Sequence, residues 1–259
     1  MTFLEGLLVV GAGLFAGAIN TIVGSGSLVT FPTLLAIGYS PVTANVSNTI
    51  GLSFGSLSGA VGYRRELGGQ RRRAMLLGTA SLTGGITGAV LLLTLPSAVF
   101  DAVVPVLILI ACALVVVQPR LSRRVAERRL RATTETGRPP VEHGGVVLWI
   151  GVFLTGIYGG YFGAAQGVIL LALLGIFIAD HLQRLNAVKN VLALIANGVA
   201  AVLFVFVADV AWEVAVLIAV GSVVGGQLGA HVGRRLPATW LRVLIVVIGI
   251  VAALRLILD

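Results

Sequence analysis

The chain has 259 residues, of which 58% are apolar and only 11% charged, whereas an ordinary soluble domain is about 45–50% apolar and about 25% charged. This composition excludes a soluble fold, and apolar runs of about 20 residues are long enough to cross a bilayer as helices. The formal net charge of +8 comes mainly from two arginine-rich stretches without interleaved aromatic residues, which indicates cytoplasmic loops and not a nucleic-acid-binding surface.

In chain order, the first half of the sequence predicts one interrupted apolar segment and then three plain membrane-spanning helices. The interrupted segment covers residues 3–37 and contains a run of small and polar residues at 20–27. Its second arm, about 13 residues long, is too short to cross a hydrocarbon core of about 30 Å alone. We therefore expect the segment to fold back as a broken helical hairpin. The plain helices are expected at 42–62, 74–94 and 98–117.

An arginine-rich loop at 118–144 follows, and we expect it to be a flexible linker or a helix lying on anionic lipid headgroups. The second half then has the same order of elements as the first. Its interrupted segment covers 146–179, with small and polar residues at 158–167. Its plain helices are expected at 184–207, 211–232 and 239–258.

The two halves are related by internal repetition, because a shift of 141 residues places Asn45 on Asn186. The repeats are expected at 1–117 and 145–259. If each interrupted segment returns to its starting side, each repeat crosses an odd number of times, and 17 of the 18 basic residues are cytoplasmic. The predicted fold is an all-α polytopic membrane protein with two inverted-topology repeats, each a broken helical hairpin plus three transmembrane helices. Both termini are expected outside.

Inverted repeats that each begin with a broken element are typical of secondary transporters, whose substrate site lies at mid-membrane where the repeats meet. The arm after each break begins with free backbone N–H groups at the positive end of the helix dipole, and such ends attract anions. The alternative is that glycine and serine only permit a tight turn. The candidate substrate-binding residues at the breaks are Asn20, Ser25, Ser27 and Gln166.

A polar face opens the helix that follows each break. Its residues are three and four positions apart, so each set shares one side of a helix. They bind substrate or, alternatively, form hydrogen bonds between helices. Lys189 is the only lysine, and its charge suits an anionic substrate unless the side chain snorkels to the cytoplasmic surface. The candidate substrate-binding residues on these faces are Asn45, Asn48 and Thr49 in the first repeat, and Asn186, Lys189 and Asn190 in the second.

Other polar residues are weaker candidates. Asp180 and His181 either relay a proton or form a loop and a helix cap, and His231 is expected at the surface. An intramembrane serine hydrolase is a remote alternative, because it needs a histidine base within reach of Ser25 and all three histidines are expected near the cytoplasmic side or in the loop. A channel, or a transporter for another small solute or ion, is a further alternative. No catalytic residue, metal site or cofactor is predicted.

Short motifs of small and polar residues recur over nearly the whole chain outside 118–144. They are Gly17, Gly24-Ser25-Gly26-Ser27, Pro32 and Ala44-Asn45-Val46-Ser47-Asn48 in the first half, and Gly163, Gly167, Arg184-Leu185-Asn186-Ala187-Val188-Lys189 and Gly225-Gly226-Gln227-Leu228-Gly229-Ala230 in the second. These motifs resemble the sulfite exporter TauE/SafE family of bacterial membrane permeases. The resemblance implies secondary transport of a small anion, such as sulfite, a sulfonate or a related organosulfur acid.

The expected function is therefore that of a permease that moves a small anion by alternating access between the two repeats. We expect a multi-pass protein of the bacterial cytoplasmic (inner) membrane, with the large basic loop in the cytoplasm. The expected partners are the anionic substrate and membrane lipids, with no nucleic acid. A coupling ion, either a proton or sodium, and a homodimer are both compatible with the sequence.

Overall fold

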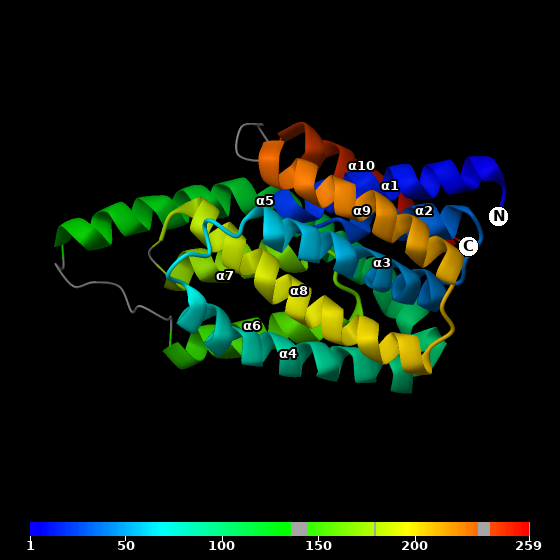
Figure 1. Ribbon diagram of the computed structural model, residues 1–259, viewed down its shortest axis with the longest axis horizontal. Coiled ribbons are helices and arrows are strands. Elements are labelled where there is room, and N and C mark those ends of the chain that lie inside the picture. Colours follow the sequence, from blue (N-terminus) through cyan, green and yellow to red (C-terminus); the bar gives the residue numbers. More distant parts are fainter. Residues whose placement is uncertain (136–144, 179, 233–238, 259) are drawn as a thin grey trace.

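The computed structural model describes residues 1–135, 145–178, 180–232 and 239–258. In that part of the chain there are ten α-helices and no strand, and the helices run along or oblique to the long axis of the molecule (Figure 1). Five of the helices found there are long and apolar enough to cross a membrane, judged by length and composition. The all-α membrane-protein fold is thus confirmed, while the opposite orientation of the two repeats stays a prediction.

The first half contains the predicted broken hairpin and the three helices that follow it. Gly24 and Ser25 lie in the short break between the two arms of the hairpin. The third helix is mostly buried along its length, which fits its many small and polar residues. The helices of the first half are α1 (Phe3–Ile22), α2 (Ser27–Ala36), α3 (Pro41–Gly62), α4 (Arg71–Thr94) and α5 (Ser97–Glu135).

Helix α5 is longer than expected. It continues past residue 117 to Glu135, and Figure 1 shows it extending beyond the other helices. The sequence there is rich in Arg, Glu, Ala and Leu, which are strong helix formers. Of the two expectations for the segment 118–144, a helix is therefore the one observed as far as Glu135, and 136–144 lies outside the described residues.

The second half follows the same plan, with a second broken hairpin and three further helices. Its break contains Phe162 to Ala165, and Ala165 adopts a positive φ of 59°. The second arm starts at Gln166. The helices of the second half are α6 (Gly145–Tyr161), α7 (Gln166–Phe177), α8 (Leu182–Val207), α9 (Trp212–Val232) and α10 (Thr239–Leu258).

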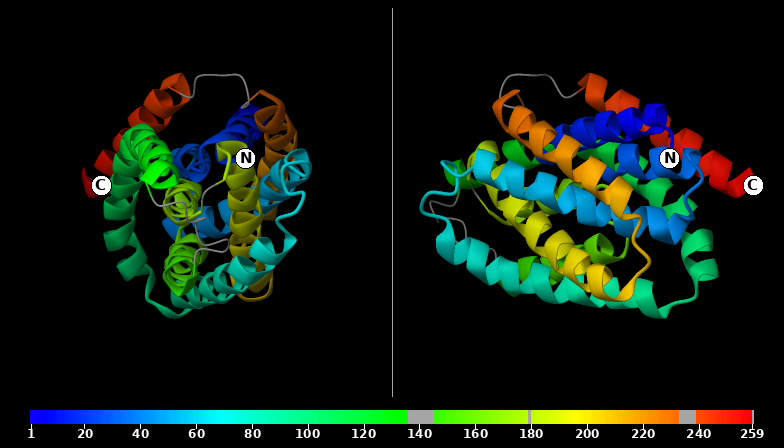
Figure 2. Two further views of the ribbon diagram at one scale, coloured as in Figure 1. Left: turned by 90° about the vertical axis from the view of Figure 1, so that its left-hand side faces the viewer. Right: turned by 45° about the vertical axis from the view of Figure 1, so that its right-hand side comes forward.

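The main helix contacts of the described residues have a counterpart when the halves are exchanged. Helix α1 packs on α9, and its equivalent α6 packs on α4. Likewise α3 packs on α9 and α8 on α4, while α10 packs on α2 and α5 on α7. Helices α3 and α8 pack on each other, as do α5 and α10. The first helix of each half thus lies against the fourth of the other, and the halves interlock (Figure 2).

Glycines allow this interlocked packing. A Cβ atom at Gly17 of α1 would lie 2.7 Å from the Cα of Ser222 in α9, and one at Gly225 of α9 would lie 2.8 Å from the carbonyl carbon of Leu14. At Gly84 of α4, a Cβ would lie 3.0 Å from the Cα of Gly156 in α6. Since apolar lipid gives no hydrophobic drive for helix association, such close backbone approach supplies the packing energy.

Candidate functional site

The tips of the two broken hairpins touch inside the protein. The N–H of Gly167, at the start of α7, donates to the carbonyl of Gly24, in the first break, at 3.0 Å. A Cβ atom at Gly167 would lie 2.5 Å from the Cα of Gly24, so no larger residue fits at this contact. Gly24 also has a φ of +93°, which glycine adopts without strain. The structure therefore brings together the two breaks that the sequence singled out.

The two first helices end in the same way. The N–H groups of Val23 and Gly24 both donate to the carbonyl of Ile19, at 2.7 and 3.1 Å. In α6, the N–H groups of Phe162 and Gly163 both donate to the carbonyl of Tyr158, at 2.9 and 3.0 Å. In each helix, the carbonyls after the shared acceptor are thus left without the backbone donors that a continuing helix would supply.

Lys189 of α8 binds the end of α1. Its side chain is fully buried, and its Nζ donates to the carbonyls of Asn20 and Thr21 at 3.1 and 3.0 Å. A cation there is favoured by the negative end of the α1 dipole as well as by the two hydrogen bonds. The amine therefore points into the protein and does not snorkel to the surface.

The asparagines of the polar faces also hold helix ends. Asn186 and Asn190 of α8 each direct Nδ2 to the carbonyl of Thr21, at 3.2 and 3.4 Å. In the other half, Asn45 of α3 donates from Nδ2 to the carbonyl of Tyr161 at 2.9 Å. Each polar face thus binds the end of the first helix of the opposite half, which is the interhelical hydrogen bonding considered as the alternative interpretation.

The remaining candidates lie beside the same breaks. Asn20 donates from Nδ2 to the hydroxyl of Ser56 at 3.1 Å, and Asn48 accepts a hydrogen bond from Thr30 of α2 through its Oδ1. Thr49 is buried on α3, and Ser27 is the partly exposed first residue of α2. The ten candidate residues therefore all lie at the two breaks or on the two polar faces that contact them.

Several polar atoms at the two breaks and on the two polar faces are buried without a hydrogen-bond partner. Such an atom costs about 1–3 kcal/mol, and clusters of them are found where a ligand or water binds. Six of the residues concerned lie at the breaks or on the polar faces. In the described part of the chain, the unpartnered atoms at the breaks and faces are Thr21 Oγ1, Ser25 Oγ, Asn45 Oδ1, Asn48 Nδ2, Asn186 Oδ1 and both amide atoms of Gln166.

Sequence reasoning missed Thr21 and the ion pairs of Asp180. Thr21 acts mainly through its carbonyl, which no side-chain pattern reveals. The Asp180 carboxylate binds Arg73 at 2.9 Å and Arg184 at 2.8 Å, and accepts the N–H of His181, the N-cap residue of α8, at 2.9 Å. Burial alone would raise the pKa of Asp180, but the hydrogen bonds from Arg73 and His181 and the charge of Arg184 hold it below its usual value. These contacts support a loop and a cap and not a proton relay.

The histidines lie away from Ser25. His181 is exposed at the start of α8, and His231 is exposed near the end of α9. His143 lies outside the described residues. Among the hydrogen bonds of the described residues, none joins Ser25 to a histidine, so the arrangement that a serine hydrolase needs is not seen there.

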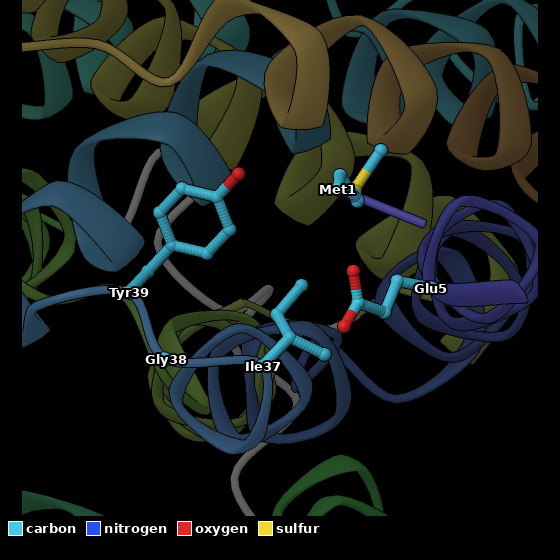
Figure 3. A pocket seen from close by; sticks show the side chains of 5 residues that line it. All are labelled: Met1, Glu5, Ile37, Gly38 and Tyr39. Atoms are coloured by element: carbon cyan, nitrogen blue, oxygen red, sulfur yellow. The ribbon is translucent and has the colours of Figure 1, made fainter. Parts of the chain in front are cut away.

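A hollow at the other end of α1 has different chemistry (Figure 3). It has a volume of about 260 Å³ and is lined by Met1, Glu5, Ile37, Gly38 and Tyr39. The carboxylate of Glu5 and the hydroxyl of Tyr39 point into it (Figure 3), and the same carboxylate accepts the N–H of Thr2 at 2.7 Å. A carboxylate repels anions, so this hollow does not suit an anionic substrate.

Comparison with known proteins identifies the family. The family model described as sulfite exporter TauE/SafE matches residues 9–256. The chain belongs to the TauE/SafE family. Among the relatives of this TauE/SafE chain is a probable membrane transporter protein, ORF9, of a Sinorhizobium species, which is 29% identical over 96% of this chain and 90% of the relative.

Two further relatives of this TauE/SafE protein have similar names. The probable membrane transporter protein YfcA of Escherichia coli strain K12 is 26% identical over 95% of this chain and 87% of the relative. A probable membrane transporter protein of Haemophilus influenzae is 25% identical over 95% of this chain and 92% of the relative. No solved structure matches the chain. The chain is therefore a membrane transporter of the TauE/SafE family, as its motifs predicted.

Proposed function

We propose that this chain is a secondary transporter that carries a small anion across the bacterial cytoplasmic membrane by alternating access. The anion is sulfite, a sulfonate or a related organosulfur acid. The observation that carries the proposal is the contact between Gly24 and Gly167, because it brings the starts of α2 and α7 to one place inside the protein. Both helix starts direct the positive end of a dipole to this place, which favours an anion.

Side-chain donors add to these helix starts. The Ser25 hydroxyl, Asn48 Nδ2 and Gln166 Nε2 are all buried and all lack a partner. An oxyanion has several oxygen atoms, each of which accepts more than one hydrogen bond. Such an anion can therefore satisfy donors that come from both hairpins and from α3 at the same time.

The charges near the breaks favour an anion over a cation of high charge. Helices α2, α3, α6, α7 and α8 contain no Asp or Glu, whereas α8 carries the buried ammonium of Lys189. Its Nζ lies at the end of α1, and a Cβ at Gly167 would lie 3.2 Å from its Cδ. In its protonated form, Lys189 thus supplies a positive charge close to the hairpin contact, and this role does not require its Nζ to touch the substrate.

The exchange symmetry of the helix contacts supports alternating access. If the two repeats are inverted in the membrane, a state in which the repeats have exchanged conformations is open to the opposite side of the membrane. The basic segments at 63–73 and 118–144 then face the cytoplasm, as the positive-inside rule favours. The relatives from Escherichia coli and Haemophilus influenzae support a bacterial membrane location.

Transport in proteoliposomes tests the proposal. The purified chain is reconstituted, and uptake of labelled sulfite and sulfoacetate is measured with and without proton and sodium gradients. We expect saturable uptake of the labelled anion, and we expect unlabelled organosulfur acids to inhibit it competitively. Uptake of a cation or a neutral solute with no uptake of these anions would overturn the proposal, and anion flux that never exceeds equilibrium under any gradient would indicate a channel.

Two variants locate the site and one serves as a control. Ser25→Ala removes an unpartnered hydroxyl, and Asn48→Asp replaces an amide donor with a carboxylate while keeping the acceptor for Thr30. Each is expected to reduce anion uptake at low concentration by at least about tenfold, equivalent to about 1.4 kcal/mol. Ser53→Ala is the control, because the Ser53 hydroxyl donates within α3 to the carbonyl of Ile50. Equal uptake by all three would place the anion elsewhere.

A further inference from the structure

The equivalent ends of α1 and α6 differ in the charge that faces them. At α1, the carbonyls of Asn20 and Thr21 receive the ammonium of Lys189. The residue of α3 that aligns with Lys189 at a shift of 141 is Asn48. Asn48 is uncharged, and its Oδ1 is bound by Thr30 of α2. Among the described residues, the hydrogen bonds at the end of α6 therefore include no equivalent of the ammonium that binds α1.

Neutral oxygen atoms gather at the end of α6. Asn45 directs its Nδ2 to the carbonyl of Tyr161, so its Oδ1 is the unpartnered atom. The amide of Gln166 packs directly on Gly159, where a Cβ atom would lie 2.3 Å from its Nε2 and 2.6 Å from its Oε1. Both side chains are 1% exposed, and neither oxygen has a partner in the described structure. The carbonyls of Gly159 and Gly160 follow the shared acceptor Tyr158 and face the end of the helix.

A further amide oxygen lies beside the same turn. A Cβ atom at Gly163 would lie 3.1 Å from the carbonyl oxygen of Gly159 and 3.7 Å from Oδ1 of Asn197 in α8. The end of α6 is thus surrounded by oxygens from its own backbone, from α3, from α7 and from α8. Breaks in helices that present carbonyls in this way coordinate monovalent cations in transporters built from repeats.

We propose that Na⁺ binds at the end of α6, with Asn45 Oδ1, Gln166 Oε1 and the carbonyls of Gly159 and Gly160 as ligands. These ligands are all neutral, whereas protein sites for Ca²⁺ and Mg²⁺ use carboxylates. They also include no group that titrates, so a proton does not replace the ion. The bound Na⁺ occupies at α6 the place that the Lys189 ammonium occupies at α1.

Gln166 connects this cation site to the proposed anion site. Both of its amide atoms are buried, unpartnered and packed on Gly159, and the next residue, Gly167, makes the contact with Gly24. In the proposed site, Oε1 binds the cation and Nε2 is left for the anion. Binding of Na⁺ orients the amide so that Nε2 points to the anion, and the positive charge of the ion attracts it. Coupled transport through Gln166 rests on the proposed function, whereas Na⁺ binding at α6 does not.

Thermal unfolding of the purified full chain without substrate tests the cation site. The melting temperature is measured in NaCl, KCl and choline chloride at equal ionic strength. We expect Na⁺ alone to raise the Tm, by roughly 3–10 °C when it is present at roughly 10 to 100 times its Kd. An equal Tm in all three salts, or an equal rise with K⁺, would overturn the proposal.

Variants assign the effect to the end of α6. Gln166→Leu keeps the size of the side chain and breaks no hydrogen bond, since both amide atoms are unpartnered, so it should fold and lose the Na⁺-dependent shift. Asn48→Lys places an ammonium at the position equivalent to Lys189 and should also remove the shift. Gln183→Leu, on the partly exposed start of α8, is the control and should keep it. A full Na⁺ shift in Gln166→Leu would refute the assignment.

Transport measurements separate coupling from binding. If Na⁺ is the coupling ion, anion uptake requires a Na⁺ gradient in the unmodified chain. A Na⁺-dependent Tm with Na⁺-independent anion uptake would overturn the coupling and leave the binding site. A Na⁺-dependent Tm with no anion uptake at all would overturn the proposed function and, again, leave the site.

Discussion

Replacing Lys189 with methionine separates the charge of this residue from its volume. Methionine has nearly the same length and keeps the packing of a side chain that is fully buried. The substitution removes the donors to the carbonyls of Asn20 and Thr21. Thr21 keeps the amide donors of Asn186 and Asn190, so only the carbonyl of Asn20 loses its side-chain partner.

The expected loss of stability is therefore modest. One buried carbonyl without a partner costs about 1–3 kcal/mol, and removal of a buried charge offsets part of that cost. For a chain of this size, about 1 kcal/mol corresponds to roughly 2–4 °C in Tm. We expect Lys189→Met to remain folded, with a Tm lowered by less than roughly 12 °C.

Transport should be affected far more than stability. If the positive charge of Lys189 holds the anion at the hairpin contact, Lys189→Met lowers the initial rate of uptake at low substrate by more than about tenfold. The measurements are Tm and proteoliposome uptake of labelled sulfite and sulfoacetate on the same preparations. Arg255→Met, which removes an exposed positive charge from α10, is the matched control. Unchanged transport by folded Lys189→Met would refute the role of this charge.

Two further predictions concern the hairpin contact and the ion pairs at the α7–α8 connection. Gly24→Ala should lower the free energy of unfolding by more than about 2 kcal/mol, because its Cβ would overlap the backbone of Gly167. Gly38→Ala is the control, since Gly38 has a similar φ of +94° but no atom within 4 Å of the added Cβ, so it reports backbone strain without overlap. Equal Tm values for the two variants would refute the contact. The pKa of Asp180 is lowered in the folded state, so its ion pairs stabilise the protein above the unfolded pKa, and this stability is lost as pH falls through the folded pKa. Asp180→Asn should therefore lower Tm near pH 7 and flatten the decrease of Tm in acid, and parallel curves for both proteins would contradict this.

The broken hairpins could be predicted because their signals are local. Runs of Gly, Ser and Asn inside an apolar segment, followed by an arm too short to span a bilayer, predict both breaks, and the helices begin and end near the expected residues. The helix up to Glu135 is one of the two structures expected for 118–144, but its continuity with the spanning helix expected to end at 117 was not predicted, because the helix formers on both sides of residue 117 do not mark where a helix leaves the membrane.

The contacts of the candidate site could be predicted only in part. Lys189 stood out as a single lysine, but its amine binds α1 because α8 lies beside the end of a helix more than 160 residues earlier in the chain. That proximity depends on the interlocking of the halves, which no local pattern encodes. The role of Thr21 was missed for the same reason, because it acts through a backbone carbonyl whose donors all come from α8.

The interlocked helices also constrain how the protein is made. The main neighbour of α1 is α9, which lies in the other half of the chain. Helix α1 therefore leaves the ribosome long before α9 has been synthesised. Until then, the glycine face of α1 that includes Gly17 has only lipid or the membrane insertion machinery beside it. Neither half therefore completes its packing alone, and we expect a chain that stops after α5 to be degraded, whereas the two halves made as separate chains assemble when expressed together.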